Sequence, residues 1–596
     1  MFTNEIGHKS MRFAYYTIFI LIWAMTLQVL YILRHQFPHE PAAPALPFLP
    51  LHTTNKEEAP AAVAYNTTTN KEEAPAEAAY NTTPTAPGLT MMYLGAHRSF
   101  ETIPDPAIVV FGNDGYLPLM LNLLCNLRHF PRMQQHTLMV VPDAQTAQVL
   151  LDLGVQITVA VSPLESVQGA HDYSTDQYKD ILTWRANSLL SLLAREKTVL
   201  CMEADVIVYQ DLTEQPEFKQ HTDLTLFWDH AVYGAGFVLF APTQRAKQFY
   251  TEVQKTLASE TEMDNEAITR LVAAQSSSVT FSKFDRCRYR AGASFKFPEE
   301  YKDCAQIPVV VQQLNWVIGM QAKIELAQAH RGWFLQDQQQ CAQRDLRAVI
   351  MTMDRADSLS RLLQSIQQAD ASTMKTDIHV SVDVGSDGIP DKGVMQVIAQ
   401  AHVAWGERGF FTYKVWERPI GIFGNWVDAW EAELYPPDLY KAVVLLEDDL
   451  ELSPHFAKWF IGAHRAYSNK NVGSVSGQRA QLVAKADITA FADRLMATWG
   501  HSPTHAHWAA FRAWAGQLDG DQSEESKAKW ESLHLKFCEA QNSFTVYPWA
   551  EHGSKTVVCN RQEHNQSSEA RPCDFPLMQD WDERLLQQEP LPLLYH

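Results

Sequence analysis

The chain has 596 residues, which is too long for one domain and predicts two or more large domains with additional segments. Hydrophobic residues make up 46% of the sequence, enough for sizeable cores, and the formal net charge is -20. Such an acidic chain argues against nucleic-acid binding, because too few basic groups are present to neutralise the phosphates broadly.

The first predicted element is an apolar segment near the N-terminus. Residues 13–33 carry no charge and are long enough to cross a bilayer as one helix. Lys9 and Arg12 precede them, which favours a cytoplasmic N-terminus. We expect a cytoplasmic tail over residues 1–12, a transmembrane signal-anchor over residues 13–33 and a luminal body, as in a single-pass type II protein.

Residues 34–102 have the composition of a disordered luminal stem. A Pro/Ala-rich tract is followed by two copies of a 15-residue repeat, TTNKEEAPAAVAYNT from Thr53 and TTNKEEAPAEAAYNT from Thr68. The repeat has too few apolar residues to build a core. Asn66 and Asn81 begin glycosylation sequons, which fits a luminal position.

A first α/β domain is expected over residues 103–340. Apolar runs that read as strands alternate there with helical patterns, which predicts a parallel sheet with crossover helices. The expected strands are 107–111, 137–141, 155–161 and 199–202, and the expected helices are 117–128 and 178–195. Glu203 and Asp205 follow the last of these strands.

A second α/β domain is expected over residues 341–596. The expected strands are 347–353, 378–384, 411–415 and 443–446, and the expected helices are 359–367, 394–405 and 426–434. The chain is therefore expected to contain two α/β units in tandem, each with a strand that runs into acidic residues.

Glu447, Asp448 and Asp449 follow the apolar run 443–446 directly. Ligands of open α/β sheets gather at the carboxyl ends of the strands. Adjacent carboxylates there repel one another unless a cation compensates them, and their oxygens suit Mn²⁺ or Mg²⁺. The alternative is a solvated acidic turn, which would have no need of a buried strand before it.

Eight cysteines are consistent with a luminal chain that contains some disulfides. Proximity in sequence suggests the pairs Cys287–Cys304 and Cys559–Cys573, and other cysteines are disulfide-bonded or buried thiols. None has the C-x-x-C spacing of a zinc site or a redox centre.

The second domain resembles the GT-A glycosyltransferases, most closely the N-acetylglucosaminyltransferase I type. The resemblance rests on AVIMTMDR at 348–355, VSVDVG at 380–385 and LEDDLELSPHF at 446–456. It implies that Arg355 meets the nucleotide diphosphate, that Asp383 holds the uracil and that Asp449 binds the metal. Glu447 and Asp448 would order the ribose and water.

Further along, the pair Trp530-Glu531 falls where this family has a Trp-Asp pair. The resemblance implies that Glu531 is the general base that deprotonates the acceptor hydroxyl. The C-terminal segment resembles the part of related enzymes in which a His caps the metal or diphosphate. His564 is the candidate, with His552 behind it, although a single His is more often a surface or core residue.

The first domain resembles the nucleotide-diphospho-sugar transferases that include plant xylosyl-, arabinosyl- and galactosyltransferases. The matching segments are NDGY at 113–116 with Asn122, the stretch 179–193, EADVIV at 203–208, the stretch 223–229, GAGFV at 234–238, MDNE at 263–266, the stretch 309–319 and Lys323. The resemblance implies nucleotide-sugar binding by Asn113 and Asp229, and metal binding by Glu203 and Asp205.

This first domain departs from its family at three positions. Glu203 replaces the first Asp of the Asp-x-Asp motif, Gly234 replaces an Asn, and Gln312-Gln313 stand where a His is usual. The domain is therefore either a second active site or a module that binds the donor or the acceptor.

Together these patterns predict a Golgi membrane glycosyltransferase with luminal catalytic domains. It would use Mn²⁺ or Mg²⁺ to transfer a sugar from a UDP-sugar to a hydroxyl of a glycan or glycoprotein. The second domain's resemblance implies inversion and the first domain's implies retention, so two working sites would make the enzyme bifunctional. A homodimer is one alternative for its oligomeric state.

The competing interpretation is a non-catalytic luminal carbohydrate-binding protein built from decayed transferase domains. A glycoside hydrolase fits poorly, because it needs two carboxylates on opposite sides of a sugar rather than a contiguous cluster. A Rossmann dehydrogenase also fits poorly, because no G-x-G-x-x-G follows a first strand.

Overall fold

The computed structural model describes residues 82–84, 90–163, 169, 175–219, 222–259, 262–274, 279–304, 307–337, 340–369, 374–405, 408–468, 471–477, 490–493, 499–517, 530–548, 556–560, 577–581, 583–587 and 591–592. These residues contain two nine-stranded mixed sheets. We call residues 82–337 the first lobe and residues 340–592 the second lobe. The mixed α/β character expected from the sequence is confirmed.

The sheet of the first lobe has the strand order β1-β2-β5-β4-β3-β6-β9-β8-β10. Its strands are β1 Thr82–Pro84, β2 Thr90–Gly95, β3 Ala107–Phe111, β4 Thr137–Val141, β5 Thr158–Val161, β6 Val199–Glu203, β8 Leu224–Asp229, β9 Val232–Phe240 and β10 Phe281–Lys283. Strands β5, β4, β3 and β6 run parallel, as predicted for crossover connections. Smaller sheets are formed by β7 Val206–Val208, β11 Tyr289–Arg290 and β12 Val311–Gln313, and by β13 Leu335–Asp337 and β14 Gln340–Cys341.

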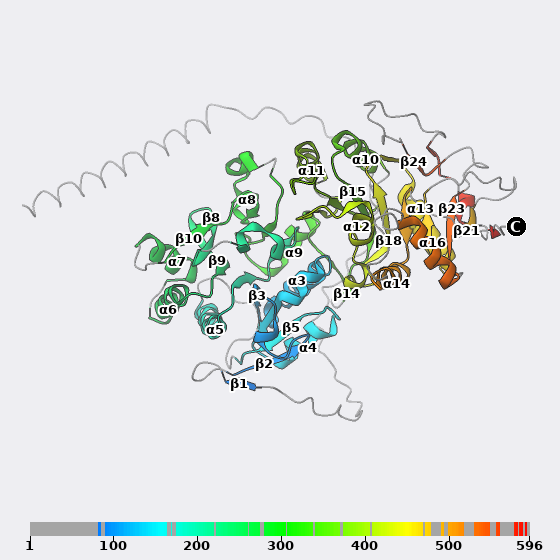
Figure 1. Ribbon diagram of the computed structural model, residues 1–596. Coiled ribbons are helices and arrows are strands. Elements are labelled where there is room, and N and C mark those ends of the chain that lie inside the picture. Colours follow the sequence, from blue (N-terminus) through cyan, green and yellow to red (C-terminus); the bar gives the residue numbers. More distant parts are fainter. Residues whose placement is uncertain are drawn as a thin grey trace, which may run out of the picture. The chain divides into compact units, whose positions relative to one another are not determined.

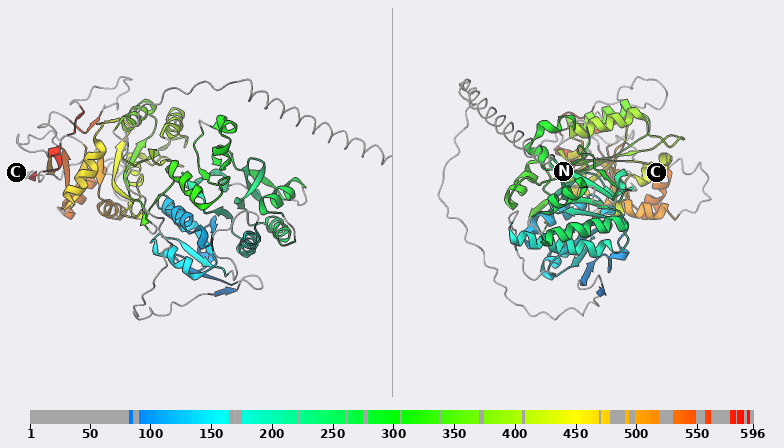
Figure 2. Two further views of the ribbon diagram at one scale, coloured as in Figure 1. Left: turned by 180° about the vertical axis from the view of Figure 1, so that it is seen from behind. Right: turned by 90° about the vertical axis from the view of Figure 1, so that its left-hand side faces the viewer.

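Helices cover both faces of this sheet. They are α2 Leu117–Leu127, α3 Pro131–His136, α4 Ala144–Asp152, α5 Asp176–Leu193, α6 Gln244–Ser259, α7 Asp264–Ala273, α8 Ala293–Lys296 and α9 Met320–Ala329. Short 3-10 turns are η1 Phe100–Thr102, η2 Asp114–Tyr116, η3 Leu212–Glu214, η4 Pro216–Lys219 and η5 Pro298–Cys304. In Figures 1 and 2, α5, α6 and α7 lie beside β8, β9 and β10.

The alternation of side chains along β3 explains the two layers of helices. Ile108 and Val110 enter the core formed with α2 and α4, whereas Ala107 and Val109 enter the core formed with α5 and α6. A strand whose residues are all apolar is expected where both faces of a sheet are covered. The continuous apolar runs in the sequence therefore correspond to strands buried on both sides.

Folded structure begins earlier than the predicted end of the stem at residue 102. Strand β2 pairs antiparallel with β5, with Met92 opposite Val161. Met91 is fully buried and Tyr93 nearly so, because both pack into the first lobe's core. Strand β1 pairs with β2 at the edge of this sheet, so the predicted disordered stem contains two strands of the first sheet, and this part of the prediction was wrong.

The sheet of the second lobe has the strand order β17-β16-β15-β18-β22-β20-β23-β21-β25. Its strands are β15 Arg344–Thr352, β16 Thr376–Val382, β17 Phe411–Val415, β18 Tyr440–Glu447, β20 Val472–Ser476, β21 Ala490–Asp493, β22 His501–Pro503, β23 Phe544–Pro548 and β25 Leu591–Pro592, and a separate pair is β19 Leu450–Leu452 with β24 Val558–Asn560. Its helices are α10 Ala356–Gln368, α11 Lys392–Trp405, α12 Gly421–Asp428, α13 Phe456–Tyr467, α14 His505–Ala515 and α16 Trp530–Gln541, with 3-10 turns η7 Ala432–Leu434 and η9 Glu583–Leu586.

The core of the second lobe also has two sides. Residues Ala348 and Ile350 of β15 pack with α10, α11 and α13, whereas Val349 and Met351 pack with α12, α14 and α16. The helix expected at 426–434 begins and ends earlier in the structure, as α12, and residues 432–434 form a separate 3-10 turn. Parallel pairing of β15 with β16 and β18 brings the carboxyl ends of these three strands to one edge.

Two disulfides are described in full. Cys287–Cys304 confirms the pairing suggested by proximity, whereas Cys125–Cys341 joins residues 216 positions apart and was not predicted. Cys559 is also disulfide-bonded, and Cys573, its predicted partner, lies outside the described residues. Cys201 and Cys538 are buried thiols.

The two lobes pack against each other within residues 78–596. Phe410 of the second lobe belongs to the core of the first lobe, and its ring stacks on that of Phe334 at 5.1 Å between centroids. Nδ1 of His129 lies 2.9 Å from the Tyr440 hydroxyl across the same boundary. The Phe410–Phe334 contact is apolar and the His129–Tyr440 contact is polar, but both are buried, so the lobes share part of one core.

Among the described residues, no helix combines the length and apolar character needed to cross a membrane. The span predicted at residues 13–33 lies outside the described residues, as do the tail and most of the stem. These parts of the topology stay predictions.

Candidate functional site

The acidic triplet of the second lobe lies at the carboxyl edge of its sheet. Glu447 is the last residue of β18 and is paired in register with Met351 of β15. Asp448 and Asp449 follow it and are almost completely buried, with exposures of 0% and 1%. A solvated acidic turn is therefore excluded, and the triplet occupies the position at which open α/β sheets bind ligands.

Each acid of the triplet has a defined contact. The indole Nε1 of Trp426 donates a hydrogen bond to Glu447 Oε1 at 3.0 Å, and the Thr352 hydroxyl donates to Asp448 Oδ2 at 2.7 Å. The guanidinium of Arg355 donates to Asp449 Oδ2 at 3.3 Å and also pairs with Asp448. Trp426 comes from α12 and Arg355 from the turn after β15, so three segments hold the acids in place.

Burial and neighbouring carboxylates disfavour the charged forms of two acids of the triplet. Burial, followed by the nearby Asp449 carboxylate, raises the pKa of Glu447 to about 7, and burial is also the main cause that raises the pKa of Asp448 to about 7. Burial acts to lower the pKa of Arg355, but Asp448 and Asp449 outweigh it and raise that pKa. Carboxylates in this state fit a hard divalent cation, which would compensate their repulsion.

Asp383 lies at the same edge, directly after β16. Its carboxylate accepts hydrogen bonds from the backbone N–H groups of Ile420 at 3.0 Å and Gly421 at 2.9 Å, and from that of Val384 at 2.9 Å. Asp383 therefore fastens the start of α12 to the end of β16. The uracil contact implied for this residue would compete with these bonds.

The remaining predicted residues of the second lobe are only partly described. Trp530 begins α16, and the Glu531 side chain lies outside the described residues although its backbone is in that helix. His552 and His564 also lie outside them. Their predicted roles as base and metal cap stay untested.

The acids of the first lobe lie at the equivalent edge of the other sheet. Glu203 ends β6 and pairs in register with Phe111 of β3, and Asp205 follows two residues later. Arg185 from α5 donates to Glu203 Oε1 at 2.8 Å, and Lys323 from α9 lies 2.5 Å from Asp205 Oδ2. Arg185 is buried, whereas Lys323 is partly buried, with a side-chain exposure of 16%.

Gln313 links these two acids. Its side-chain amide nitrogen lies 2.7 Å from Glu203 Oε2 and 3.2 Å from Asp205 Oδ1. Arg185 also pairs with Asp264, which begins α7. The polar groups that surround Glu203 and Asp205 are therefore mainly donors, so these acids are compensated by the protein itself.

Asp229 and Asn113 also lie near this edge. The Asp229 carboxylate accepts hydrogen bonds from the Asn315 amide at 2.7 Å and the Trp316 indole at 2.5 Å. Burial raises the pKa of Asp229 to about 6. Asn113 follows β3 and donates to the backbone carbonyl of Gly169 at 2.8 Å. The structure therefore brings both residues to the predicted edge, each with protein partners.

Several residues of these two sites were not assigned from the sequence. Arg185 lies in the family-matching segment 179–193 and Thr352 in the motif at 348–355, but neither was given a role, and Trp426 resembles other core-lining residues. Lys323 and Gln313 were noted within family segments, but their contacts with the acids depend on the fold. Only the order of the family motifs could have directed attention to these two residues.

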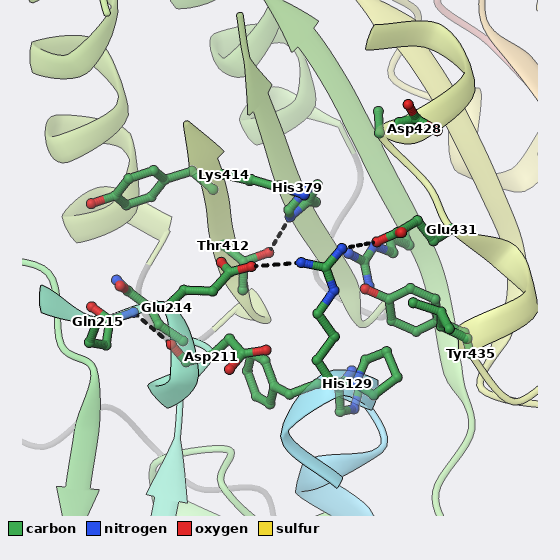
Figure 3. A pocket seen from close by; sticks show the side chains of 18 residues that line it. His129, Asp211, Glu214, Gln215, His379, Thr412, Lys414, Asp428, Glu431 and Tyr435 are labelled. Carbon is green, nitrogen blue, oxygen red and sulfur yellow. Dashed lines mark hydrogen bonds and ion pairs between the residues drawn. The ribbon is translucent and has the colours of Figure 1, made fainter. Parts of the chain in front are cut away.

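A polar pocket lies where the two lobes meet (Figure 3). Asp211 and Glu214 come from the first lobe, whereas His379 and Lys414 come from β16 and β17 of the second. Arg347 also lines the pocket and is buried, with its guanidinium 4.6 Å from the centre of the Tyr435 ring. Neither set of predicted acids lines this pocket.

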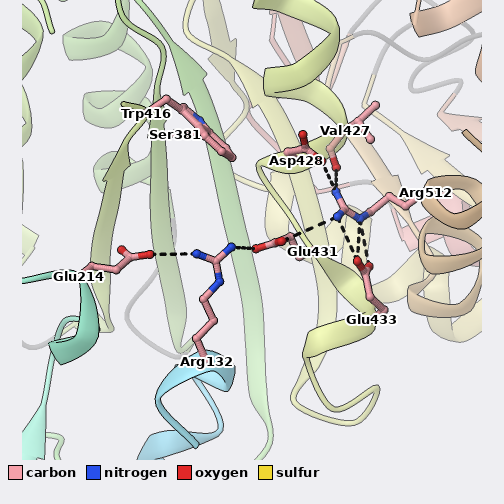
Figure 4. Close-up of polar contacts among 9 residues, drawn as sticks. All are labelled: Arg132, Glu214, Ser381, Trp416, Val427, Asp428, Glu431, Glu433 and Arg512. Carbon is pink, nitrogen blue, oxygen red and sulfur yellow. Dashed lines mark hydrogen bonds and ion pairs between the residues drawn. The ribbon is translucent and has the colours of Figure 1, made fainter. Parts of the chain in front are cut away.

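A chain of ion pairs crosses the lobe boundary at this pocket (Figure 4). Arg132 of α3 contacts Glu214 at 3.3 Å and Glu431 at 2.7 Å, and Arg512 of α14 contacts Glu433 at 3.0 Å. The Arg132 side chain is 42% exposed, so each of its pairs contributes little to stability. Because the charges satisfy one another, we interpret the pocket as part of the lobe interface.

Residues 132–326 match the model of the nucleotide-diphospho-sugar transferase family. This segment lies within the first lobe, covers about a third of the chain and contains Glu203, Asp205 and Lys323. A search of curated protein sequences gave no match.

Solved glycosyltransferase structures share low similarity with the chain. GlyE of Streptococcus pneumoniae TIGR4 is 11% identical over 52% of this chain and 79% of its own, with a TM-score of 0.27. The galactosyltransferase LgtC, in complex with donor and acceptor sugar analogs, is 14% identical over 37% of this chain and 95% of its own, with a TM-score of 0.27. We base no inference on matches with such low TM-scores.

Proposed function

We propose that the chain is a metal-dependent glycosyltransferase that transfers a sugar from a UDP-sugar to a hydroxyl of a glycan or glycoprotein. The observation that carries the proposal is the acidic triplet at the carboxyl edge of the second sheet, in which Asp448 and Asp449 are buried and Glu447 is half-buried. The family match of residues 132–326 independently supports nucleotide-sugar chemistry in the same chain. We place catalysis in the second lobe.

The residues of the second lobe have distinct roles in this proposal. Asp449, with Glu447 and Asp448 beside it, would hold Mn²⁺ or Mg²⁺, which would offset the charge that develops on the leaving diphosphate. The Arg355 side chain is 30% exposed, so its guanidinium can contact a phosphate while it remains next to the acids. Glu531 is the proposed base that removes the proton of the acceptor hydroxyl.

We infer a binding role for the first lobe, as a module for a donor or acceptor sugar. Arg185 and Lys323 already compensate Glu203 and Asp205, which reduces the need for a metal ion there. A second active site in the first lobe is the alternative, and it would make the enzyme bifunctional.

We also propose that the protein is a single-pass type II protein of the Golgi membrane. Residues 13–33 support this topology by their length and lack of charge, and the described disulfides support an oxidising lumen. Placement of an epitope tag at each end, with protease protection of intact vesicles, would test it.

The test of the catalytic proposal is release of UDP from a panel of UDP-sugars by the purified full-length chain. We expect release that requires Mn²⁺ or Mg²⁺, is abolished by EDTA and increases with a suitable glycan acceptor. D449N should reduce the rate by at least about 100-fold, because it removes an electrostatic group from the metal site. D205N in the first lobe is the matched control and should retain most of the rate.

Three results would contradict the proposal in different ways. Absence of UDP release with every donor would favour the non-catalytic carbohydrate-binding protein. Loss of activity in D205N but not in D449N would move the chemistry to the first lobe. Partial loss in both variants, with two different product linkages, would indicate two working sites.

A further inference from the structure

Two helices of the second lobe bring two imidazoles and a thiol together away from the acidic triplet. His507 lies in the first turn of α14, and His534 and Cys538 lie on α16. A spacing of four residues puts His534 and Cys538 on the same face of their helix. Helices α14 and α16 pack against each other, so this face meets His507.

The distances within this cluster resemble those between the ligands of one metal ion. His507 Nε2 lies 3.1 Å from His534 Nε2, and Cys538 Sγ lies 3.8 Å from each of these nitrogens. Metal–nitrogen bonds of about 2.0–2.1 Å and a metal–sulfur bond of about 2.3 Å separate tetrahedral ligands by about 3.3 Å for two nitrogens and about 3.6 Å for nitrogen and sulfur. The observed separations of 3.1 Å between the nitrogens and 3.8 Å between each nitrogen and the sulfur are close to these values.

The chemistry of the cluster favours a transition metal over the hard cations suited to the triplet. Imidazole and thiolate are preferred by Zn²⁺, whereas Mg²⁺ and Mn²⁺ prefer oxygen. His534 and Cys538 are buried, with exposures of 2% and 3%, and His507 is half-buried.

The backbone also makes room for the cluster. A Cβ atom at Gly473 of β20 would lie 2.5 Å from ring atoms of His507, so the glycine allows that imidazole to lie against the sheet. The rings of Phe511 and Phe537 pack beside His534 and His507. His507 therefore packs against β20 and Phe537, and His534 packs against Phe511.

We propose that His507, His534 and Cys538 form a Zn²⁺ site that joins α14 to α16. Water would take the fourth coordination position, as in zinc sites with three protein ligands. Sγ of Cys538 lies 3.7 Å from Nδ1 of His534 and 3.8 Å from its Nε2, so neither ring nitrogen is clearly closer to the sulfur. The His534 ring must therefore turn before the lone pair of its Nε2 points at the metal position. Binding would release the thiol proton, and the proton shared between the two Nε2 atoms would move to Nδ1 of the ring that carried it.

The site has a structural consequence for the proposed active site. Helix α16 begins at Trp530, next to Glu531, and its ligands His534 and Cys538 lie in the following turns. Zn²⁺ would fix the start of this helix relative to α14. The inference itself does not depend on the proposed function, because metal binding can be measured without any activity.

The test is the metal content of the purified full-length chain after extensive dialysis, measured by inductively coupled plasma mass spectrometry. We expect one tightly bound zinc per chain. H534Q and C538S should each lose the bound zinc. Removal of a group that only hydrogen-bonds to a metal ligand weakens metal affinity by roughly 10–100-fold, and removal of the ligand itself should weaken it more. C201S, which changes the other buried thiol, and D449N, which changes the triplet, should both retain zinc.

Exchange of zinc for Co²⁺ gives a second readout on the unmodified chain. A thiolate-to-cobalt charge-transfer band with intense visible bands would identify a tetrahedral site that includes Cys538. Wild-type protein that retains no zinc and shows no such band would overturn the inference, leaving a histidine pair with a neighbouring thiol in an aromatic core. Zinc retained in both H534Q and C538S would also overturn it. If these variants fail to fold, the wild-type metal content and cobalt spectrum decide.

Discussion

Substitution of Asp383 tests whether this residue holds the protein or the nucleotide. Its carboxylate is 5% exposed and accepts hydrogen bonds from the N–H groups of Ile420 and Gly421, at the start of α12. Gly421 has a φ of +67°, a conformation that glycine adopts with little strain. Helix α12 also carries Trp426, whose indole contacts Glu447. Loss of the carboxylate should therefore loosen α12 and, through it, the acidic triplet.

The expected magnitude follows from the contacts that are lost. A hydrogen bond to a charged group contributes about 1.5–3 kcal/mol, and removal of a helix-capping side chain costs about 0.5–2 kcal/mol. Water can solvate part of the exposed backbone, so we expect D383A to lower the free energy of unfolding of the second lobe by about 2–4 kcal/mol. D383N keeps one acceptor oxygen and should lose about half as much.

The assay is thermal unfolding of the full-length chain together with the KM for the UDP-sugar. A loss of 1 kcal/mol corresponds to a shift of about 2–4 °C in Tm for a domain of this size. D387A is the matched control, since Asp387 is exposed and bonds only within its own turn, to the N–H of Ile389. If D383A raises KM strongly without a shift in Tm, Asp383 binds uracil and our interpretation of its hydrogen bonds is refuted.

Three further predictions concern the first lobe and the lobe boundary. K323M should destabilise the first lobe by about 3–5 kcal/mol, because it leaves the buried Asp205 carboxylate without its cation. Thermal unfolding should show that the double variant K323M/D205N recovers part of this loss. Equal stability of wild type and K323M would contradict the prediction. Removal of the Cys125–Cys341 disulfide, in the double Ala variant, should cost up to about 5 kcal/mol in urea unfolding, because it frees a loop of 216 residues; an unchanged midpoint would contradict it. Burial and then Arg344 hold the pKa of His129 well below its usual value. The stability that neutral His129 contributes is therefore present above about pH 6.5 and is lost as pH falls. Between pH 7.5 and 5, the Tm of H129Q should fall less than the Tm of wild type.

The sequence predicted the strands well where the apolar signal is local and continuous. The ranges 107–111, 137–141 and 411–415 are the observed bounds of β3, β4 and β17. The helix expected at 426–434 was misplaced, because its true start is set by Asp383, a residue far away in the sequence. A cap supplied from another element leaves no mark in the local pattern.

The candidate site was predictable in position but not in its electrostatics. The run at 443–446 and the acids after it were enough to place Glu447, Asp448 and Asp449 at a sheet edge, because side-chain periodicity and strand length are local properties. The cations that compensate such acids come from distant segments. No spacing in the sequence indicated that Lys323 would lie beside Asp205, 118 residues away.

The sequence by itself determined the order of strands and helices and the acids that end two of the strands. The luminal position suggested by the span and the cysteines stays a prediction. Tertiary structure alone decided how the charges are distributed between the two lobes. It compensated Glu203 and Asp205 with Arg185 and Lys323, and it gathered His507, His534 and Cys538 into one cluster. The physical reason is that ion pairs and metal ligands act over a few ångströms in space, whereas propensity and periodicity act over a few residues along the chain.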